Sequence, residues 1–478
     1  MSQKVTLIYG DGIGPEVVGA TREIIDASGA GIEWEVCEAG EKVFEQGLET
    51  GVPQETVESI KRNRIALKGP LATPVGFGQK SANVTLRKMF ETYGNIRPVR
   101  EMPGVKTPFT GRNIDLVIVR ENVEDLYAGI EYMQTPDVAE CLKLISRSGC
   151  EKIVRLAFEF ARSNGRKLVH CATKANIMKL TEGLLKRTFE EIAENEYPDI
   201  ESRHIIVDNC AHMLVKQPEN FDVIVTTNMN GDILSDLSSA LVGGLGFAPG
   251  ANLGDDIAIF EAVHGSAPKY AGKNNINPTA VLLSGVMMLR HLGKFTEAEA
   301  IEQALLYTMA IDNKLTRDAV GDANAVSTTE FTNAIIGNLG KDYEGNNKRE
   351  HKHLSMPKSP SRSTIDNSDR YIAGLDVFVE ANEEVQELGK SFESICQDSP
   401  FQLKLISSRG VKVYPLGDTQ PDVGNFFCCR LTARENGVDD DAINGLVQKI
   451  TAQHHWMHIE KLTKLGDRNG FSKTHGEE

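Results

Sequence analysis

The sequence predicts an α/β protein that carries a separate α+β module near its C-terminal end. Over the first 340 residues, short apolar runs rich in β-branched residues alternate with helical patterns, as in domains whose helices pack on a sheet. A polar segment follows, and a second set of strand and helix patterns comes after it. With 478 residues, the chain exceeds the size of one hydrophobic core, so we expect two or three domains.

The expected strands are short apolar runs, and the expected helices have apolar residues three and four positions apart. The strands are expected at residues 4–9, 65–68, 114–119, 167–170, 204–207 and 221–226. The helices between them include residues 14–28, 150–164 and 178–194. The glycine-rich tract 242–254 is expected to be a loop that approaches another group closely, because so much glycine is too flexible for an interior element.

Residues 338–370 have few apolar side chains and two prolines, a composition typical of a linker. After it, strand patterns at 374–380, 402–406, 412–414, 426–431 and 456–459 alternate with helical patterns at 383–396 and 439–451. Residues 371–478 are therefore predicted to form a compact α+β module, long enough to fold alone.

Composition and charge exclude several classes of protein. A formal net charge of -15 argues against nucleic acid as a partner, because binding the phosphate backbone needs clustered Lys and Arg. No apolar run approaches the roughly 20 residues that cross a bilayer, and the polar N-terminus has no leader pattern, so no membrane partner is expected. The eight cysteines show no C-x-x-C spacing, which favours reduced thiols and a cytoplasmic protein.

A pair of aspartates follows the apolar run at 221–225, in the motif N-G-D-I-L-S-D. If residues 233–242 form a helix, Asp232 and Asp236 lie on one face, where like charges destabilise by about 0.2 to 0.5 kcal/mol. A bound cation would offset this cost. The alternative is a solvated acidic face at the start of a helix, where aspartates suit the helix dipole.

A set of basic and polar residues suited to small anions stands in an otherwise acidic chain. It comes from the stretches K-S-A-N-V-T-L-R-K, N-I-R-P-V-R and V-R-E-N-V-E-D-L-Y-A-G-I-E, and comprises Ser81, Asn83, Arg87, Arg97 and Arg120. Several arginines near hydroxyl and amide donors could hold a tricarboxylate, because a guanidinium binds carboxylate at two points. Taken singly, each arginine is more often a surface ion-pair partner.

Lys174, in C-A-T-K-A-N-I-M-K, follows an apolar strand, where open α/β sheets place active residues. A buried lysine can act as a base, and a tyrosine such as Tyr127 could donate or relay a proton. The alternative is a solvated lysine at a strand end, and the sequence does not say whether the two side chains meet.

Two glycine-containing loops remain. In G-D-G-I-G-P-E-V, Pro15 stands in the stretch where the dinucleotide motif G-x-G-x-x-G needs its third glycine, so a turn leading into a helix is favoured over cofactor binding. In F-E-A-V-H-G-S-A-P-K-Y-A-G, Lys269 and Tyr270 could supply charge and stacking to a phosphorylated ribose. The alternative for this second loop is an ordinary connection.

Together these motifs resemble the isocitrate and isopropylmalate dehydrogenase family, the metal-dependent β-decarboxylating dehydrogenases. The resemblance covers residues 1 to about 337 and rests on S-x-N-x-x-x-R, R-P-V-R, R-E-N-x-E-D-x-Y-A-G-I-E, K-x-N-I-M-K, N-x-N-G-D-x-x-S-D and H-G-S-A-P-K-Y-A-G, in family order. It implies the fold of that family, which is not a Rossmann fold. Residues 1–92 with 243–337 would form a large domain on the cofactor side, and 93–242 a small, dimer-forming domain.

The resemblance also implies residue roles. Ser81, Asn83, Arg87, Arg97 and Arg120 look like the substrate-carboxylate set, Tyr127 like the catalytic tyrosine and Lys174 like the lysine contributed by the partner subunit. Asp232 and Asp236 look like ligands of Mg²⁺ or Mn²⁺, and Asp208 like the ligand that reaches the metal from the other subunit, so a homodimer with a shared active site is implied. The residues implied to bind the cofactor are Thr73, His264, Gly265, Lys269, Tyr270 and Asn277.

The substrate implied is isocitrate rather than isopropylmalate, because Ser81 and Asn83 offer hydrogen bonds to an extra carboxylate. An unmatched buried polar group costs about 1 to 3 kcal/mol, enough to separate the two substrates. NADP is implied because family members that use NAD have an aspartate where Lys269 stands. One departure is L-T-R-D-A-V-G, where the additional tyrosine and arginine of some NADP enzymes cannot be aligned.

The expected reaction is therefore oxidative decarboxylation of isocitrate to 2-oxoglutarate and CO₂ with reduction of NADP. The metal would make the substrate hydroxyl more acidic, Lys174 would help to remove its proton, and Tyr127 would protonate the enol. The alternatives are an NAD-dependent enzyme, a homoisocitrate or isopropylmalate dehydrogenase, and a catalytically silent regulatory subunit. The last would usually have lost motif residues that this chain retains.

The C-terminal module resembles the extension on a subset of longer bacterial isocitrate dehydrogenases, including the stretches W-M-H-I-E-K-L and G-F-S-K-T-H-G-E-E. We expect it to make an intersubunit contact rather than to sense a ligand. His454, His455 and His458 could suggest a metal site, but neighbouring residues of a strand face opposite sides. Packing or surface placement is therefore favoured for these histidines.

Overall fold

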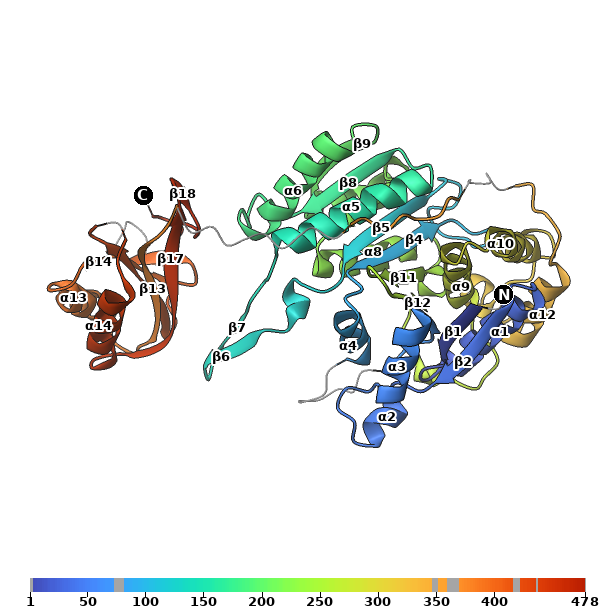
Figure 1. The fold of residues 1–478 in the computed structure, drawn as a ribbon, viewed down its shortest axis with the longest axis horizontal. Helices are drawn as coiled ribbons and strands as arrows, with labels where there is room; N and C mark the ends of the chain where they lie inside the picture. Colours follow the sequence, from blue (N-terminus) through green and yellow to red (C-terminus); the bar gives the residue numbers. More distant parts are fainter. Residues whose placement is uncertain are drawn as a thin grey trace. The chain divides into compact units, whose positions relative to one another are not determined.

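The computed structural model describes residues 3–72, 81–345, 351–358, 369–415, 422–435 and 437–477 (Figure 1). The chain divides into two compact units. The first unit is Met1–Ala128 with Lys143–Ser361, and the second unit is Gly129–Leu142 with Arg362–Glu478. A mixed α/β unit and a separate antiparallel sheet confirm the predicted fold class. No helix within the described ranges is long and apolar enough to cross a membrane.

The first unit is built on one ten-stranded sheet. Its strands, in spatial order, are β2 (Ile32–Cys37), β1 (Gln3–Ile8), β3 (Ile65–Lys68), β12 (Ala258–Ala262), β11 (Pro249–Leu253), β4 (Gly94–Arg100), β5 (Asp115–Glu121), β10 (Val223–Thr226), β8 (Leu168–Thr173) and β9 (Glu201–Ile206). Most neighbours are parallel, but β11 is antiparallel to both β12 and β4, and β4 is antiparallel to β5. This break distinguishes the sheet from the parallel Rossmann sheet, as the sequence predicts.

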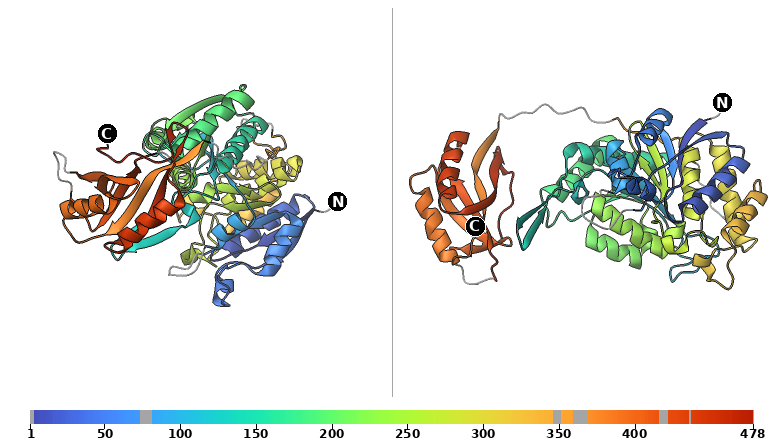
Figure 2. Two further views of the ribbon diagram at one scale, coloured as in Figure 1. Left: turned by 60° about the vertical axis from the view of Figure 1, so that its left-hand side comes forward. Right: turned by 90° about the horizontal axis from the view of Figure 1, so that it is seen from below.

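Helices cover both faces of this sheet (Figure 2). One face packs against α1 (Gly14–Ala27), α5 (Arg147–Ser163), α6 (Thr181–Glu196), α9 (Thr279–His291), α10 (Phe295–Ala310) and α12 (Thr328–Gly337). The other face packs against α3 (Gln54–Asn63), α4 (Ala82–Met89), α7 (Val207–Lys216) and α8 (Asn228–Leu241). Because side chains alternate along a strand, β4 sends Ile96 into the first layer and Val99 into the second.

The six expected strands and three expected helices of this unit are confirmed, with shifted ends. The strand expected at 204–207 is β9, which begins at Glu201 and ends at Ile206, because Val207 already starts α7. The helix expected from residue 233 is α8, which begins five residues earlier. Edge strands and first helical turns carry many polar residues, so apolar periodicity locates them poorly.

The prediction of a loop over the whole glycine-rich tract 242–254 is wrong, because residues 249–253 form β11. This strand is fully buried and hydrogen-bonded on both sides. A Cβ on Gly250 would lie 2.9 Å from the backbone oxygen of Glu261, so glycine permits close packing here. Asn252 is also satisfied inside the sheet, where it donates to Glu261 and accepts from Asn95. The strand was not predicted because small residues and hydrogen-bonded polar groups stand where a buried strand usually has large apolar side chains.

The second unit contains a six-stranded antiparallel sheet with two helices on one face (Figure 1). Its strands, in spatial order, are β15 (Val411–Tyr414), β14 (Phe401–Ser408), β16 (Phe426–Ala433), β13 (Arg370–Glu380), β17 (His455–Leu465) and β18 (Arg468–Asn469), and its helices are α13 (Val385–Cys396) and α14 (Asp440–Thr451). All five predicted strands and both predicted helices of the module are present.

A hairpin from far earlier in the sequence also belongs to the second unit. It consists of β6 (Glu131–Thr135) and β7 (Val138–Cys141), which were predicted within the small domain 93–242. His458 Nδ1 of β17 lies 3.6 Å from a carboxylate oxygen of Glu140, and its ring stacks on Phe378. His454 stacks on Phe392, whereas His455 is exposed. The three histidines are thus accounted for by packing and surface placement. The division of residues 1–337 into a large and a small domain stays a prediction.

In the predicted linker, the described residues 338–345 and 351–358 form no helix or strand, but part of this segment packs on the first unit. Lys352 N donates to the backbone oxygen of Ser163 at 3.0 Å, and Leu354 and Met356 pack against the main core. Residues 351–358 are therefore not a free spacer.

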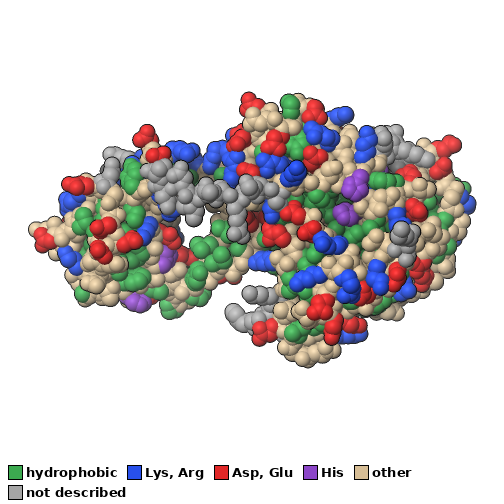
Figure 3. Space-filling model, in the orientation of Figure 1, with side chains coloured by type: hydrophobic (Ala, Val, Ile, Leu, Met, Phe, Trp, Pro, Cys, Tyr) green, Lys and Arg blue, Asp and Glu red, His purple; other side chains and the backbone are tan. Residues whose placement is uncertain are grey.

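Over the surface seen in Figure 3, acidic and basic side chains are interspersed. The face seen in that view is therefore of mixed charge.

Candidate functional site

The two aspartates of the N-G-D-I-L-S-D motif lie one helical turn apart on α8, as predicted. The glycine of the motif brings this helix close to β5, because a Cβ on Gly231 would lie 2.5 Å from Cγ of Arg120. Any larger side chain at this position would push α8 away from the strand. The sequence thereby places Asp232 and Asp236 beside the end of β5.

Asp232 is the centre of a cluster that joins residues from four parts of the sequence. Its Oδ1 accepts hydrogen bonds from Nη1 of Arg97, at 3.2 Å, and from Nη1 of Arg120. Its Oδ2 accepts a hydrogen bond of 2.6 Å from the hydroxyl of Tyr127. Arg97 also lies 3.7 Å from Asp236. The structure therefore brings together two predicted substrate residues, the predicted catalytic tyrosine and two predicted metal ligands.

Charge and burial shift the acidities in this cluster. Burial alone would raise the pKa of Asp232, but Arg120, the Tyr127 hydrogen bond and Arg97 outweigh it, so this pKa lies below its ordinary value. The pKa of Asp236 is raised by burial, with the charge of Asp232 adding to the effect against Arg97. Burial, followed by the hydrogen bond to Asp232, raises the pKa of Tyr127, which keeps this hydroxyl protonated near neutral pH.

The donor set of α8 fits a hard divalent cation. Carboxylate oxygens are the ligands that Mg²⁺ and Mn²⁺ prefer, and the two aspartate side chains are 36% and 56% exposed, so they are open to a ligand. Within the described ranges of one chain, no group of three or more His, Cys, Asp or Glu residues could hold a metal ion. One chain thus brings together two of the three predicted ligands, Asp232 and Asp236.

Lys174 and Asp208 form a second cluster. Lys174 directly follows β8, and its Nζ lies 3.0 Å from Oδ1 of Asp208 in the first turn of α7. The hydrogen bond from Lys174 lowers the pKa of Asp208. Both residues are those implied to act in the active site of a partner subunit. In this chain they pair with each other rather than with Asp232.

A pocket of about 90 Å³ joins predicted substrate residues to predicted cofactor residues. Its lining includes Asn83, Arg87 and Arg97 from the first set and His264 and Gly265 from the second. His264 Nδ1 donates to the backbone oxygen of Gly265 at 3.2 Å, and burial lowers the pKa of this imidazole. The imidazole of His264 is therefore neutral, and it lines the same pocket as Arg87 and Arg97. Of the other predicted site residues, Ser81 is the N-cap residue of α4, and Thr73 lies outside the described residues.

A buried ion network, not predicted from the sequence, forms part of the wall of this pocket. Glu261 pairs with Lys68 and, at 3.0 Å, with Nη2 of Arg87, and Lys68 Nζ donates to Oδ1 of Asn83 at 2.7 Å. Burial would raise the pKa of Glu261, but Lys68 and Arg87 hold it well below its usual range. The network orients Asn83 and Arg87. The only signal in the sequence was one charged residue near the end of each of two apolar strands, Lys68 in β3 and Glu261 in β12.

The predicted cofactor loop collects positive charge around Tyr270. The guanidinium of Arg317 lies 5.1 Å from the centre of the Tyr270 ring, and Nζ of Lys273 lies 5.7 Å from it. Lys269 precedes Tyr270 in the same short 3-10 helix, η4 (Pro268–Tyr270). Arg317 comes from L-T-R-D-A-V-G, the stretch in which the additional tyrosine and arginine of some NADP enzymes could not be aligned. It is a cofactor-site candidate that only the structure places beside the loop.

Two further contacts hold this loop. Asn277 donates from Nδ2 to Asp318 at 2.9 Å, which ties the loop to α11 (Arg317–Val320), and accepts from the backbone N–H of Thr279 at the start of α9. On the other side, a Cβ on Gly12 would collide with the backbone oxygen of Ser266. The G-D-G-I-G-P-E-V turn therefore packs closely against this loop, and it leads into α1, the helix that the sequence predicts.

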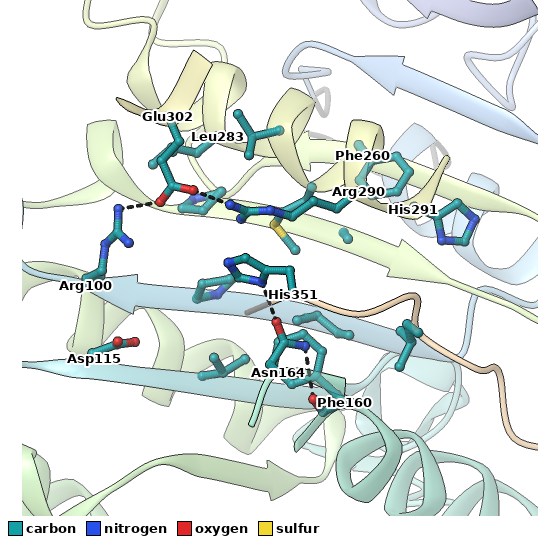
Figure 4. Close-up of a pocket in the computed structure, with 18 of the residues that line it drawn as sticks. Arg100, Asp115, Phe160, Asn164, Phe260, Leu283, Arg290, His291, Glu302 and His351 are labelled. Carbon is teal, nitrogen blue, oxygen red and sulfur yellow. Dashed lines mark hydrogen bonds and ion pairs between the residues drawn. The ribbon is translucent and has the colours of Figure 1, made fainter. Parts of the chain in front are cut away.

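A second, apolar cavity lies on the opposite layer of the sheet, between the sheet and α9 (Figure 4). Several of its charged groups are paired with each other, since Glu302 pairs with both Arg100 and Arg290, and Arg166 pairs with Asp115. None of the predicted site residues is among the described residues that line it. The candidate site is therefore the one formed around Asp232 on the α8 side of the sheet.

The fold and the site define a member of a known family. Residues 4–335 match the family described as isocitrate/isopropylmalate dehydrogenase, and the chain belongs to that family. Residues 370–477 match the domain described as the C-terminal domain of bacterial isocitrate dehydrogenase. The class is thus the longer, bacterial type with an added C-terminal domain.

Particular relatives resemble all or most of the chain. The protein called isocitrate dehydrogenase (NADP) of Thermus thermophilus is 59% identical over 99% of this chain and 96% of its own length, and that of Rickettsia bellii is 39% identical over 99% of both. A crystal structure of a Thermus thermophilus protein superposes with a TM-score of 0.96 at 58% identity, covering 100% of this chain and 97% of that one. An isocitrate dehydrogenase structure from Methylococcus capsulatus covers 71% of this chain and 99% of its own, with a TM-score of 0.68 and 46% identity.

Proposed function

We propose that this protein is an NADP-dependent isocitrate dehydrogenase that converts isocitrate to 2-oxoglutarate and CO₂. The observation that carries the proposal is the cluster in which Arg97, Arg120 and Tyr127 all donate to Asp232. The names of the full-length relatives support the choice of isocitrate and NADP within the family. The same residues are expected to act in every catalytic member of the family, so substrate choice needs further argument.

The residues around the cluster suit a tricarboxylate. Isocitrate carries three carboxylates, and Arg87, Arg97 and Arg120 supply three guanidinium groups that can each bind a carboxylate at two points. Asn83, oriented by Lys68, and Ser81 offer polar contacts that a carboxylate can use and an isopropyl group cannot. Isocitrate is therefore the preferred substrate, with homoisocitrate and isopropylmalate as the competitors to be measured.

The residues present fit a divalent metal, Mg²⁺ or Mn²⁺. Asp232 and Asp236 of one chain, together with Asp208 of the partner subunit, would hold it in the proposed homodimer. When bound, such an ion polarises a substrate oxygen and lowers the pKa of the substrate hydroxyl. The aspartates also keep the arginines in place, because Asp232 bridges Arg97 and Arg120.

Tyr127 and Lys174 would handle the protons. Tyr127 stays protonated because burial and its hydrogen bond to Asp232 raise its pKa, so it can donate a proton to the substrate carbon after CO₂ has left. Lys174 of the partner subunit would assist removal of the proton from the hydroxyl. Because Lys174 pairs with Asp208, both side chains would enter the second active site together.

The cofactor loop fits the phosphorylated ribose of NADP. Lys269, Lys273 and Arg317 gather around Tyr270, and three cations can neutralise a 2′-phosphate that NAD lacks. His264, Gly265 and Asn277 belong to the same loop and its supports. Hydride transfer is the chemistry that NADP supplies when it is bound.

Kinetic comparison of substrates tests the proposed function. The purified full-length chain, assayed with Mn²⁺, should have its highest kcat/KM for isocitrate with NADP, and lower values for homoisocitrate, isopropylmalate and NAD. The appearance of NADPH is followed by absorbance, with enzyme treated with a chelator as the control. If neither NADPH nor NADH forms with any of the three acids, the result favours a regulatory subunit. A higher kcat/KM for another acid or for NAD would reassign the substrate or the cofactor.

Replacing Lys269 with Asp should weaken NADP selectively. A charge-assisted hydrogen bond contributes about 1.5 to 3 kcal/mol, so kcat/KM for NADP is expected to fall about 10- to 100-fold, with little change for NAD. The matched control is Lys42→Asp, the same charge change at an exposed lysine of α2 (Glu41–Glu45). An equal fall for NADP and NAD would contradict recognition of the 2′-phosphate by this lysine.

A further inference from the structure

A buried ion cluster next to the site contains three residues to which the sequence analysis assigned no role. Lys143 Nζ pairs with Asp125 and, at 2.9 Å, with Glu182. Both carboxylate side chains are completely buried, and the Lys143 side chain is 13% exposed. Burial acts to lower the pKa of Lys143, but hydrogen bonds to the two carboxylates outweigh it and raise this pKa. Lys143 is thus a fixed cation between two buried anions.

Asp125 connects the catalytic tyrosine to the metal-binding helix. It lies two residues before Tyr127, in a left-handed backbone conformation with φ of 66°, and its N–H donates to the backbone oxygen of Leu144. Its Oδ2 accepts the backbone N–H of Met229 at 2.9 Å, in the first turn of α8. A carboxylate at this end of a helix is stabilised by the helix dipole. The position of the Tyr127 loop is therefore tied to the helix that carries Asp232.

Glu182 connects the other catalytic residue to the same helix. Its Oε2 accepts the backbone N–H of Lys174 at 3.0 Å. Its Oε1 accepts the hydroxyl of Thr227, the N-cap residue of α8, at 3.1 Å. The turn that carries Lys174 and the helix that carries Asp232 therefore share one buried carboxylate.

We propose that Lys143 is a positioning residue that couples the two active sites of the dimer. This inference rests on the proposed function, in which Tyr127 and Asp232 serve one site and Lys174 of the same chain serves the other. Lys143 holds together the two carboxylates that position these groups. Without its charge, Asp125 and Glu182 repel each other in a region from which water is excluded, and the elements bound to them must move.

The first test replaces Lys143 in the intact enzyme. Lys143→Met should lower kcat about 10- to 100-fold, because small displacements of catalytic groups have effects of that size. The KM for NADP should stay within about twofold, since the cofactor loop makes no contact with the cluster in the described structure. Lys143→Arg, which keeps the charge, should lose less activity than Lys143→Met.

A matched control and a double variant separate positioning from general destabilisation. Lys152→Met removes a lysine of similar burial, 16% exposed and paired with Glu91, and should leave kcat unchanged. Adding Glu182→Gln to Lys143→Met removes the repulsion, so the double variant should lose less than the product of the two single losses. Equal losses for Lys143 and Lys152, or strictly multiplicative losses in the double variant, would overturn the positioning role. If Lys143→Met does not assemble, the kcat values of Lys143→Arg and of Glu182→Gln are compared with that of Lys152→Met instead.

Hybrid dimers test the coupling of the two sites. A dimer of an Asp232→Asn chain with a Lys174→Met chain keeps one intact site, formed by Asp232 of the second chain and Lys174 of the first. Lys143→Met is then added to either chain in turn, and activity is measured. Coupling predicts a loss from both placements, whereas loss from only one would refute it. An inactive hybrid before Lys143 is changed would refute the shared site of the proposed function and the coupling with it, while the kcat series above would still decide whether Lys143 positions catalytic groups.

Discussion

Replacing Asp232 with Asn should abolish turnover, with kcat reduced by at least about three orders of magnitude. The change removes a proposed metal ligand, and it also removes the carboxylate that binds Arg97, Arg120 and Tyr127. Arg120 is 1% exposed, so its lost ion pair is not replaced by water. The measurement is kcat at saturating isocitrate, NADP and Mn²⁺, together with Mn²⁺ binding by calorimetry.

The control for this variant is Asp256→Asn, at a 77% exposed aspartate that pairs with Arg64. It should have ordinary kcat and ordinary Mn²⁺ binding, because a surface ion pair contributes little. Retained turnover in Asp232→Asn would refute the assignment of the acid pair. Lost turnover with ordinary Mn²⁺ binding would instead restrict Asp232 to holding Arg97, Arg120 and Tyr127.

Mixing two inactive variants should restore activity. Asp232→Asn disables the site of its own chain, whereas Lys174→Met disables the site of the partner, if the active site is shared between subunits. When the two proteins are dissociated, mixed in equal amounts and reassociated at random, half of the dimers are hybrids with one intact site of two. About a quarter of the wild-type activity is expected.

The structural basis of this prediction is the separation of the two clusters within one chain. Tyr127 donates to Asp232 on α8, whereas Lys174 pairs with Asp208 at the start of α7. Mixing each variant with itself is the control and should give no recovery. If the mixture of the two variants also stays inactive although hybrids are present by native mass spectrometry, each chain contains its whole site and the shared-site proposal fails.

Much of the site could be predicted because its residues lie in local motifs. The spacing of Asp232 and Asp236 places them on one face of any helix. Lys174 follows β8, a strand that can be recognised from the apolar residues within it. The strand and helix patterns of both units were recognised for the same reason. Local periodicity is decided within a few residues, so sequence is sufficient to locate it.

Other features depend on residues far apart in the sequence. The pairing of Glu261 with Lys68 and Arg87, and the approach of Arg317 to Tyr270, each join separate segments. The burial of β11 was missed because its glycine and asparagine are stabilised by strands on both sides rather than by their own apolar surface. The hairpin of β6 and β7 could not be assigned to the second unit before its packing was known.

Local patterns in the sequence are enough to predict the class of fold, the order of the elements and the residues around the acid pair. Which of these residues meet depends on the tertiary fold, in which Asp232 binds two arginines and a tyrosine, and Lys174 pairs with Asp208. The tertiary fold also places Lys143 between two buried carboxylates. The physical reason is that helices and strands follow from short-range geometry, whereas the charge and burial of a side chain depend on the segments that fold against it.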